Sequence, residues 1–551
     1  MVRRPDLHKL KTYVMFANWF HRIQSFMPTA AKNILHSRIT TGESLLRGND
    51  WKVIAGIIIG LGIILRLVPY LHNRSLWLDE TWLALNILQK PFSQLVGLLD
   101  WKQMAPVGFL FIEKTLVLNF GDSEYVLRFF PLLAGIFSLF LFYGVARRIL
   151  TNRGCAIALG LFAISEHLLR YSSELKQYSS DVAIALVISL LGLTCLEKES
   201  RFVRSLFLFS IVGAILIWFS HPAIFSLAGV GIALTLYYLK TEKWHHLGWL
   251  FLPASFWLGS FALNYFTHIT WSQNPKMVPG WSGSSAFLPL VPASGGDLIS
   301  FLKVLLNMLL NPGGLPFYGL AAFCFMIGWV SAFSEKRFAC YMLTLPIFVT
   351  LLASGLHKYP FQGRLILFLV PAMMIFIGGG VDRIMTVARS SGRFVGMSVC
   401  VLLFLFPVYT AMAILLNPGK MDREEVRTVM TYLSEHFREE DTLYLYHSSE
   451  AAFEYYAKRL GLEKVAYRQG VASKRNWDNY INDLRALEGS DRVWVLFSHV
   501  HKNHGVDEEK FFLYVLDGMG KQIDSFKRTG ASLYLYDLQS NSPGKEILSE
   551  K

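Results

Sequence analysis

Two adjacent carboxylates occupy an aromatic and apolar setting near the start of the chain. Asp79 and Glu80 lie between two tryptophans, shortly after the first long apolar run, residues 53–70. Charged groups are costly in or beside hydrocarbon, so this pair is expected to have either partners or a chemical task. An aspartate with the ordinary pKa of about 4 is ionised at neutral pH, and a positioned general base accelerates a reaction roughly 10²–10⁴-fold. The structural alternative is a pair of capping acids for a helix that begins at Thr81.

Two more acids, Glu174 and Asp181, form a second candidate set. They are seven residues apart, so on a continuous helix both side chains would lie on one face. Ion pairing with Arg170 or Lys176 is the structural alternative.

Three basic side chains, His357, Lys358 and Arg364, fall close together late in the chain. Such a cluster suits an anionic ligand, because charge-assisted hydrogen bonds to phosphate or carboxylate are strong. The structural alternative is anchoring at the membrane interface, where long basic side chains extend toward lipid headgroups.

The elements that carry these residues are predicted to be membrane helices. Hydrophobic residues make up 53% of the 551-residue chain and charged residues 17%, and the apolar residues come in long blocks. About 20 apolar residues span the hydrocarbon core as a helix, so this composition indicates a polytopic α-helical membrane protein. The net charge of +13 is dispersed over short loops, which argues against a nucleic-acid partner and for membrane topology. We predict eleven spans, near 52–71, 124–146, 154–170, 180–196, 203–219, 222–239, 246–267, 315–333, 338–354, 364–381 and 394–416.

The distribution of basic residues predicts which loops share a side of the membrane. With a cytoplasmic N-terminus every inside connection is basic, as the positive-inside rule expects. The basic segment 1–50 fits the same side and resembles an interfacial helix. Counting the shorter apolar stretches 106–120 and 298–310 as spans would turn basic connections outward, so we expect both to be helices at the outer surface. The inside connections carry Arg147, Arg148, Arg153, Lys198, Arg201, Arg204, Lys240, Lys243, Lys336, Arg337, Arg383, Arg389 and Arg393.

The chain therefore divides into a cytoplasmic N-terminal segment, a membrane domain and a polar C-terminal domain. The C-terminal domain alternates helical periodicity with short strand-like runs, which indicates an extracytoplasmic α/β domain. It contains no Gly-rich phosphate loop, zinc-ligand spacing or nucleophile elbow, so recognition or stabilisation is favoured over catalysis. The boundaries are 51–416 for the membrane domain, with outer loops 72–123, 171–180, 268–300 and 355–364, and 417–551 for the C-terminal domain, with strands expected at 442–446, 493–497 and 532–536 and helices at 422–437, 450–460 and 506–519.

In order and spacing, these features resemble the GT-C glycosyltransferases that use polyprenyl-phosphate sugars, which include protein mannosyltransferases and aminoarabinose transferases. The elements that carry the resemblance are an acidic pair after the first span, an amphipathic segment that begins near Pro106, an arginine after it, an acidic second outer loop and a basic last outer loop. In this sequence they are Asp79-Glu80, the segment from Pro106 to Glu124, Arg128, Arg147-Arg148, the run from Tyr171 to Tyr178 with Asp181, and the run from Tyr359 to Leu365.

The resemblance implies transfer of a sugar from a lipid phosphate to a hydroxyl group, with inversion by direct displacement. Asp79 is then the expected general base, and Glu80 either orients it or binds a metal ion. The phosphate leaving group needs cations more than a general acid. The expected phosphate-binding residues are Lys102, His357, Lys358 and Arg364. Lys102 departs from the family pattern, in which a histidine or lysine often directly precedes the proline, because three residues separate it from Pro106.

In the same family the second outer loop supplies an acidic metal ligand or acceptor contact, for which Glu174 and Asp181 are the two candidates here. A divalent cation, Mg²⁺ or Mn²⁺, is the one cofactor that the resemblance allows. Asp79, the 171–181 segment and the 357–364 segment should line one outward cavity.

The resemblance also implies the donor and the location of the protein. Nucleotide sugars are made in the cytoplasm, so an outer active site requires a polyprenyl-phosphate sugar that has already crossed the membrane. The expected location is the bacterial inner (plasma) membrane, with the site and the C-terminal domain facing the periplasm or exterior. The acceptor stays open between a protein, a lipid-linked glycan, a lipid A-like lipid and a cell-wall polymer; Trp271 and Trp281 of loop 268–300 are candidate contacts.

Two other classes of function are weighed against the enzyme. A transporter or lipid flippase usually shows internal repeats and ionisable or broken helices near the bilayer midplane, and these signs are weak in this sequence. A non-catalytic scaffold that presents the C-terminal domain would leave Asp79-Glu80 and the basic 357–364 segment unexplained.

Overall fold

The computed structural model describes residues 48–197, 202–269, 287–290, 292, 294–387, 389–473, 476–503 and 505–539. The chain forms two compact units, residues 1–56 and 57–551. Of the first unit, the described part is the start of α3 (Gly48–Leu71). The predicted interfacial helix within 1–50 and the two tryptophans of loop 268–300 lie outside the described residues, apart from 48–50.

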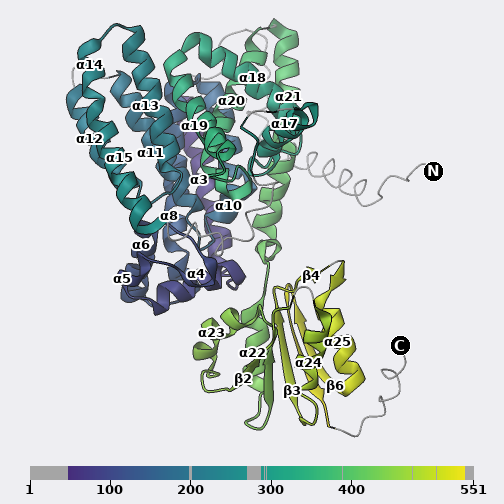
Figure 1. Ribbon diagram of the computed structural model, residues 1–551. Coiled ribbons are helices and arrows are strands. Elements are labelled where there is room, and N and C mark those ends of the chain that lie inside the picture. The colour runs from purple at the N-terminus through teal and green to yellow at the C-terminus, as the bar shows by residue number, and fades with distance from the viewer. Residues whose placement is uncertain are drawn as a thin grey trace. The chain divides into compact units, whose positions relative to one another are not determined.

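Apolar helices dominate the second unit, and they correspond to the predicted spans. Among the described residues, nine helical stretches are long and apolar enough to cross a membrane, and two shorter apolar helices, α9 and α12, fall at the remaining predicted spans. The chain is therefore an integral, polytopic α-helical membrane protein (Figure 1). The helices in these stretches are α3, α8 (Phe129–Ile149), α9 (Asn152–Ile164), α11 (Tyr178–Glu197), α12 (Phe202–Leu216), α13 (Ala223–Lys240), α14 (Trp244–Trp249), α15 (Phe251–Asn264), α18 (Tyr318–Glu335), α19 (Arg337–Gly355), α20 (Val370–Val387) and α21 (Arg389–Leu416).

The segment between α9 and α11 is broken, which corrects one expectation. The short helix α10 (Glu166–Tyr171) ends seven residues before the start of α11, and Glu174 lies in the turns between them. Glu174 and Asp181 therefore do not lie on one continuous helix, and their seven-residue spacing does not place them on one helix face.

The basic connections at one end of the bundle contact one another. Lys336 Nζ donates to the carbonyl oxygen of Arg148 (2.7 Å), and Arg153 pairs with Asp382 at 2.5 Å. These contacts join three of the connections that the sequence analysis places on one side. The membrane orientation itself stays a prediction.

The first loop is largely helical. It contains α4 (Leu78–Gln89), α5 (Phe92–Leu95), α6 (Val107–Phe120) and α7 (Glu124–Leu127). The predicted helices near 106–120 and 298–310 are both present, the second as α17 (Gly295–Leu310), which begins with a capping box.

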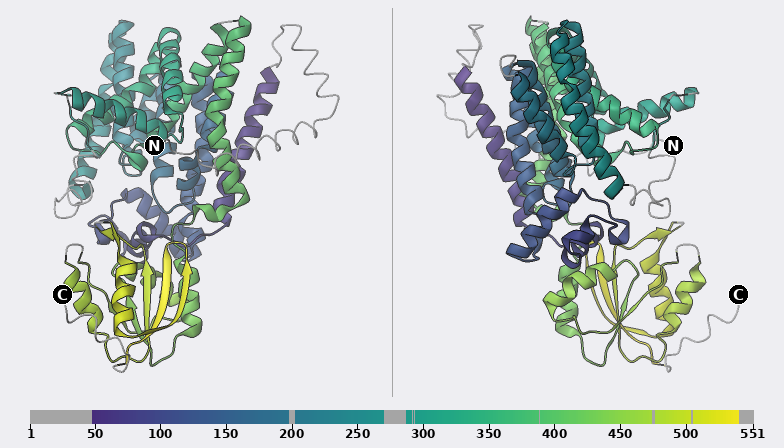
Figure 2. Two further views of the ribbon diagram at one scale, coloured as in Figure 1. Left: turned by 90° about the vertical axis from the view of Figure 1, so that its right-hand side faces the viewer. Right: turned by 60° about the vertical axis from the view of Figure 1, so that its left-hand side comes forward.

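The C-terminal domain is an α/β sandwich around a five-stranded sheet of order β2-β1-β3-β7-β6. The first three of these strands are parallel and the last two join antiparallel. Side chains alternate across the sheet, so Leu443 and Leu445 face one layer of helices while Tyr444 and Tyr446 face the other. The helices α22 (Val426–His436) and α23 (Glu450–Ala457) cover one face of the sheet, and α24 (Trp477–Arg485) and α25 (Glu508–Met519) cover the other (Figures 1 and 2). The strands of the sheet are β1 (Thr442–Leu445), β2 (Tyr467–Gln469), β3 (Val493–Ser498), β6 (Lys521–Arg528) and β7 (Ala531–Asp537).

The first loop and the C-terminal domain share one hydrophobic core. Buried side chains of α4 and α6, such as Leu83 and Phe109, belong to the same cluster as Val429 of α22, Phe453 of α23 and Trp494 of β3. The right-hand view of Figure 2 shows α4 next to α22 and α23. The C-terminal domain is thus packed directly against α4, the helix whose first turn contains Asp79 and Glu80.

Candidate active site

Asp79 lies where three segments meet that are far apart in the sequence. Its carboxylate oxygens are 3.1 Å from Lys176 Nζ and 2.7 Å from an Arg364 guanidinium nitrogen. Gln103 donates to the same carboxylate (3.1 Å) and accepts a hydrogen bond from Lys176 (2.7 Å). Asp79 and Gln103 thus come from the first predicted outer loop, Lys176 from the second and Arg364 from the last.

The electrostatics of this cluster keep Asp79 ionised. Burial alone would raise the pKa of the Asp79 carboxyl, but the charges of Lys176 and Arg364 outweigh burial and hold its pKa well below the usual value. Burial lowers the pKa of Lys176, against the opposing charge of Asp79. The Asp79 side chain is 13% exposed and that of Arg364 24%, so the cluster is only partly closed.

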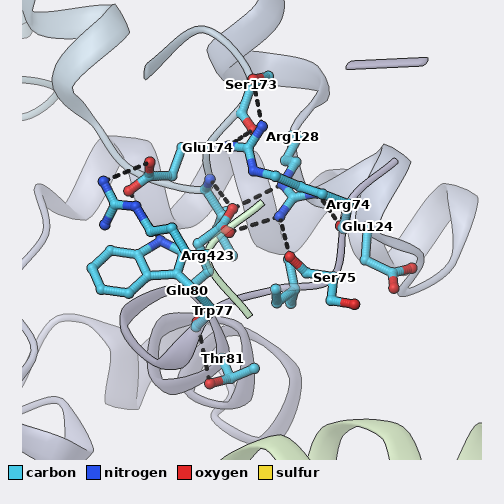
Figure 3. Close-up of polar contacts among 12 residues, drawn as sticks. Arg74, Ser75, Trp77, Glu80, Thr81, Glu124, Arg128, Ser173, Glu174 and Arg423 are labelled. Carbon is cyan, nitrogen blue, oxygen red and sulfur yellow. Dashed lines mark hydrogen bonds and ion pairs between the residues drawn. The ribbon is translucent and has the colours of Figure 1, made fainter. Parts of the chain in front are cut away.

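Glu80 points into a different and closed environment. It is fully buried and receives two hydrogen bonds from Arg128, at 2.8 and 2.6 Å, and a third from the backbone N–H of Leu175 (2.7 Å). Arg128 also donates to the carbonyl oxygens of Arg74 and Ser75 (Figure 3). Burial would raise the pKa of Glu80, but Arg128 reverses this and lowers it.

Neither acid acts as the helix cap of the structural alternative. Helix α4 begins at Leu78 with Trp77 as its N-cap, and Trp77 supplies no side-chain cap. The cap comes from the C-terminal domain, because Glu424 accepts a hydrogen bond from the backbone N–H of Leu78 (3.1 Å). His499 contacts the other oxygen of Glu424 at 2.6 Å and so helps to fix this carboxylate.

Glu174 is a neighbour of the Asp79 cluster. It accepts a hydrogen bond from the indole N–H of Trp77 (3.1 Å) and is 3.9 Å from Arg423, whose guanidinium lies 4.1 Å from the Trp77 ring centroid (Figure 3). The C-terminal domain thus reaches the second loop through Trp77.

Asp181 lies apart from Glu174, in the first turn of α11. It is buried, and its Oδ1 atom has no hydrogen-bond partner among the described residues.

Three of the predicted phosphate-binding residues lie outside the cluster. Lys102, His357 and Lys358 are exposed, and the His357 ring stacks on Phe287 (5.1 Å). Lys102 and His357 are both in the left-handed region of backbone conformation. Arg364 is the member of the predicted set that contacts Asp79.

The residues present do not fit the predicted divalent cation. The oxygens of Asp79 face two positive side chains, and Glu174 faces an indole N–H and Arg423. Within the described ranges, no group of three or more His, Cys, Asp or Glu side chains is placed to hold a metal ion.

Sequence reasoning missed three functional candidates, Lys176, Gln103 and Arg423. A usable signal existed for Lys176, because a basic residue is unusual in an outer loop, as it also is for Arg364. No comparable signal marks Gln103, an uncharged residue next to Lys102, or Arg423, whose role depends on docking of the C-terminal domain.

Comparison with known proteins gives a match in structure alone. No protein-family model matches the chain, and no curated protein sequence is similar to it. Solved structures of ArnT from Cupriavidus metallidurans overlap with nearly the whole chain. The apo structure has a TM-score of 0.52 at 11% identity and covers 88% of this chain and 98% of ArnT. The structure bound to undecaprenyl phosphate has a TM-score of 0.52 at 12% identity and covers 89% and 98%.

An archaeal oligosaccharyltransferase, AglB from Archaeoglobus fulgidus in complex with an inhibitory peptide and a dolichol-phosphate, overlaps less closely. Its TM-score is 0.47 at 11% identity, over 91% of this chain and 75% of AglB. ArnT is an aminoarabinose transferase of the GT-C fold. This chain therefore shares the GT-C fold of the ArnT structures.

Proposed function

We propose that this protein is a membrane glycosyltransferase that moves a sugar from a polyprenyl-phosphate donor to a hydroxyl group of an extracytoplasmic acceptor. The observation that carries the proposal is the contact of Asp79 with Lys176 and Arg364, at 3.1 and 2.7 Å, within a GT-C fold. A base and two cations are the groups that this transfer needs, because the acceptor loses a proton while the donor releases a phosphate.

The two cations give the donor phosphate a place to bind. Arg364 is partly exposed, and its guanidinium also lies 5.4 Å from the ring centroid of Tyr178 and 6.0 Å from that of Trp77. A planar guanidinium donates two parallel hydrogen bonds to a phosphate, and a buried ammonium adds a compact charge. In this proposal Arg364 is kept from the predicted set of four phosphate-binding residues, and Lys176 takes the place of the other three.

Binding of the phosphate would also prepare the base. In the free protein the two cations hold the pKa of Asp79 low, so its carboxylate accepts protons poorly. When Lys176 and Arg364 turn toward the donor phosphate, they stabilise the Asp79 charge less, and its pKa rises toward the usual value. Asp79 then takes the proton of the acceptor hydroxyl as the hydroxyl oxygen attacks the anomeric carbon and the lipid phosphate leaves. One direct displacement of this kind inverts the anomeric centre.

Glu80 has a positioning role in this proposal. Its oxygens are occupied by Arg128 and by the Leu175 N–H, so it fixes the first turn of α4 against the second loop. This contact holds Asp79 close to Lys176, because Lys176 directly follows Leu175.

The test is sugar transfer in membranes that contain the full chain, supplied with radiolabelled polyprenyl-phosphate sugars or, as the control, with the corresponding nucleotide sugars. We expect transfer from the lipid-linked donor alone and a product of inverted anomeric configuration by NMR. Transfer from the nucleotide sugar, a retained configuration, or no transfer from any lipid-linked donor would contradict the proposal.

A further inference from the structure

A second polar site lies beside the Asp79 cluster, between the start of α4 and the C-terminal sheet. It is a cavity of about 520 Å³, a size within the range of about 300–1,000 Å³ that is typical of small-molecule sites. Its wall on the membrane-domain side is Trp77, two residues before Asp79. The other lining residues come from the C-terminal domain: Arg423, Glu424, His499, Val500, Glu509, Lys527, Arg528, Gly530, Ala531 and Ser532.

The acids of this cavity already have partners. Glu424 is held by His499 and by the backbone N–H of Leu78. Glu509 accepts hydrogen bonds from the hydroxyls of Ser532 and Tyr534. Among the described residues, neither carboxylate forms an ion pair with Arg423, Lys527 or Arg528.

The cations of the cavity have hydrogen-bond donors that are not used in close ion pairs. Lys527 and Arg528 are exposed at the end of β6, and in the described part of the chain neither lies within 4.0 Å of a carboxylate. They rest instead over the rings of Tyr534 and Phe526, at 4.8 and 4.5 Å. Arg423 has one distant acid, Glu174 at 3.9 Å. The unused donors of the cavity are thus positive, which favours an anionic oxygen ligand.

The position of this cavity is built into the fold. The turn between β6 and β7 is attached to the start of the C-terminal domain, because the Glu425 N–H donates to the Thr529 carbonyl (2.8 Å) and the Thr529 N–H donates to the Glu425 side chain (3.1 Å). Gly530 has a φ of +65°, and a Cβ atom there would come within 2.1 Å of the Arg423 carbonyl oxygen. Glycine thus lets the turn that carries Lys527 and Arg528 approach Arg423 closely.

From this arrangement, we infer that the cavity binds the phosphate- or carboxylate-bearing part of an anionic saccharide, the acceptor of the transfer. The assignment of this saccharide as the acceptor rests on the proposed function. Its physical basis is the juxtaposition of three positive side chains, hydroxyl-binding groups such as Glu509 and His499, and the short path through Trp77 to Asp79. A saccharide seated there would present its next hydroxyl to the Asp79 carboxylate.

The test is calorimetric binding to the purified full chain in detergent, with trehalose 6-phosphate, trehalose and glycerol 3-phosphate as probes. We expect trehalose 6-phosphate to bind roughly tenfold or more tightly than either other probe, the effect of about one charge-assisted contact or one set of hydroxyl contacts. The double variant Lys527→Gln/Arg528→Gln should lose this preference. Its matched control, Lys510→Gln/Lys521→Gln, removes the same charge from exposed positions of the same domain outside the cavity and should keep it.

Four results would overturn the inference: no detectable binding of trehalose 6-phosphate, equal binding of trehalose, equal binding of glycerol 3-phosphate, or the same loss in both double variants. Equal binding of glycerol 3-phosphate would point to a lipid headgroup and would overturn the saccharide assignment. Because binding needs no donor and no turnover, the two proposals fail separately. A chain that binds the sugar phosphate yet transfers no sugar contradicts the proposed function, and a chain that transfers sugar without this binding contradicts the cavity assignment.

Discussion

Asp79 and Glu80 are neighbours in the sequence, but they occupy two regions of opposite character. The Glu80 region is closed: its carboxylate is fully buried, and Arg128 and a backbone N–H occupy its oxygens. The Asp79 region is partly open, and its partners are two cations that a phosphate can attract away. The difference teaches that two adjacent acids can have separate roles. The Glu80 carboxylate fixes the backbone, and the Asp79 carboxylate is left available for chemistry.

The largest expected effect concerns the closed region. Glu80→Gln would leave Arg128 as an uncompensated buried charge, which costs about 3–5 kcal/mol of stability. Denaturant or thermal unfolding of the detergent-purified protein measures this loss. The double variant Glu80→Leu/Arg128→Met should recover much of it, because replacing both partners by apolar residues leaves no unpaired charge. A Glu80→Gln protein as stable as the wild type would remove the distinction between the two regions.

The next effect concerns the cations of the open region. Arg364→Gln removes one charge-assisted contact of about 1.5–3 kcal/mol, so the KM for the donor should rise roughly 10–100-fold. Lys358→Gln is the matched control, because Lys358 is an exposed cation of the same loop and should leave the donor KM unchanged. If Lys358→Gln raised the donor KM as much as Arg364→Gln does, the sequence-based set of phosphate-binding residues would be restored.

A smaller effect is expected where the C-terminal domain caps α4. Glu424→Ala removes the carboxylate that accepts the Leu78 N–H, and loss of a helix cap costs about 1 kcal/mol. Hydrogen exchange should become faster in the first turn of α4, while Glu435→Ala, an exposed change in the same domain, should leave it unaltered. Unchanged exchange in both variants would show that the start of α4 is held without the C-terminal domain.

The smallest effect appears only in acid. Because the pKa of Asp79 is lowered on folding, its ion pairs stabilise the protein fully above the unfolded pKa of about 4, and this contribution is lost as pH falls below that value. The stability advantage of the wild type over Asp79→Asn should therefore shrink below about pH 4. Unfolding curves of both proteins measured from neutral to acid pH test this expectation, and an advantage that grew in acid would contradict it.

Much of the fold was predictable, because the apolar periodicity and the length of each span are local properties. The strands 442–446, 493–497 and 532–536 were also correct, since buried β-branched and aromatic runs mark the inner strands. The strands β2 and β6 and the helix α24 were missed. β2 and β6 lie at the sheet edges and carry exposed polar residues, so their sequences lack the apolar signal that identifies inner strands.

The candidate site was predictable only in part. Asp79 and Arg364 were found because a charge beside an apolar span is rare. The structure places Lys102, His357 and Lys358 outside the Asp79 cluster, because proximity in sequence says little about where a loop turns. Their role in phosphate binding stays a prediction. The partners of Glu80 and the cap from Glu424 depend on contacts between distant segments, which a single sequence does not report.

The most direct test of the account compares sugar transfer per folded molecule in Asp79→Asn and Glu80→Gln, with folded protein quantified in each sample. A lost general base should cost about 10²–10⁴-fold in turnover, so Asp79→Asn should be folded and nearly inactive. Glu80→Gln should be poorly stable, but its folded fraction should retain most of the transfer. Transfer that survives Asp79→Asn, or that disappears from folded Glu80→Gln, would contradict the assignment of Asp79 as the base.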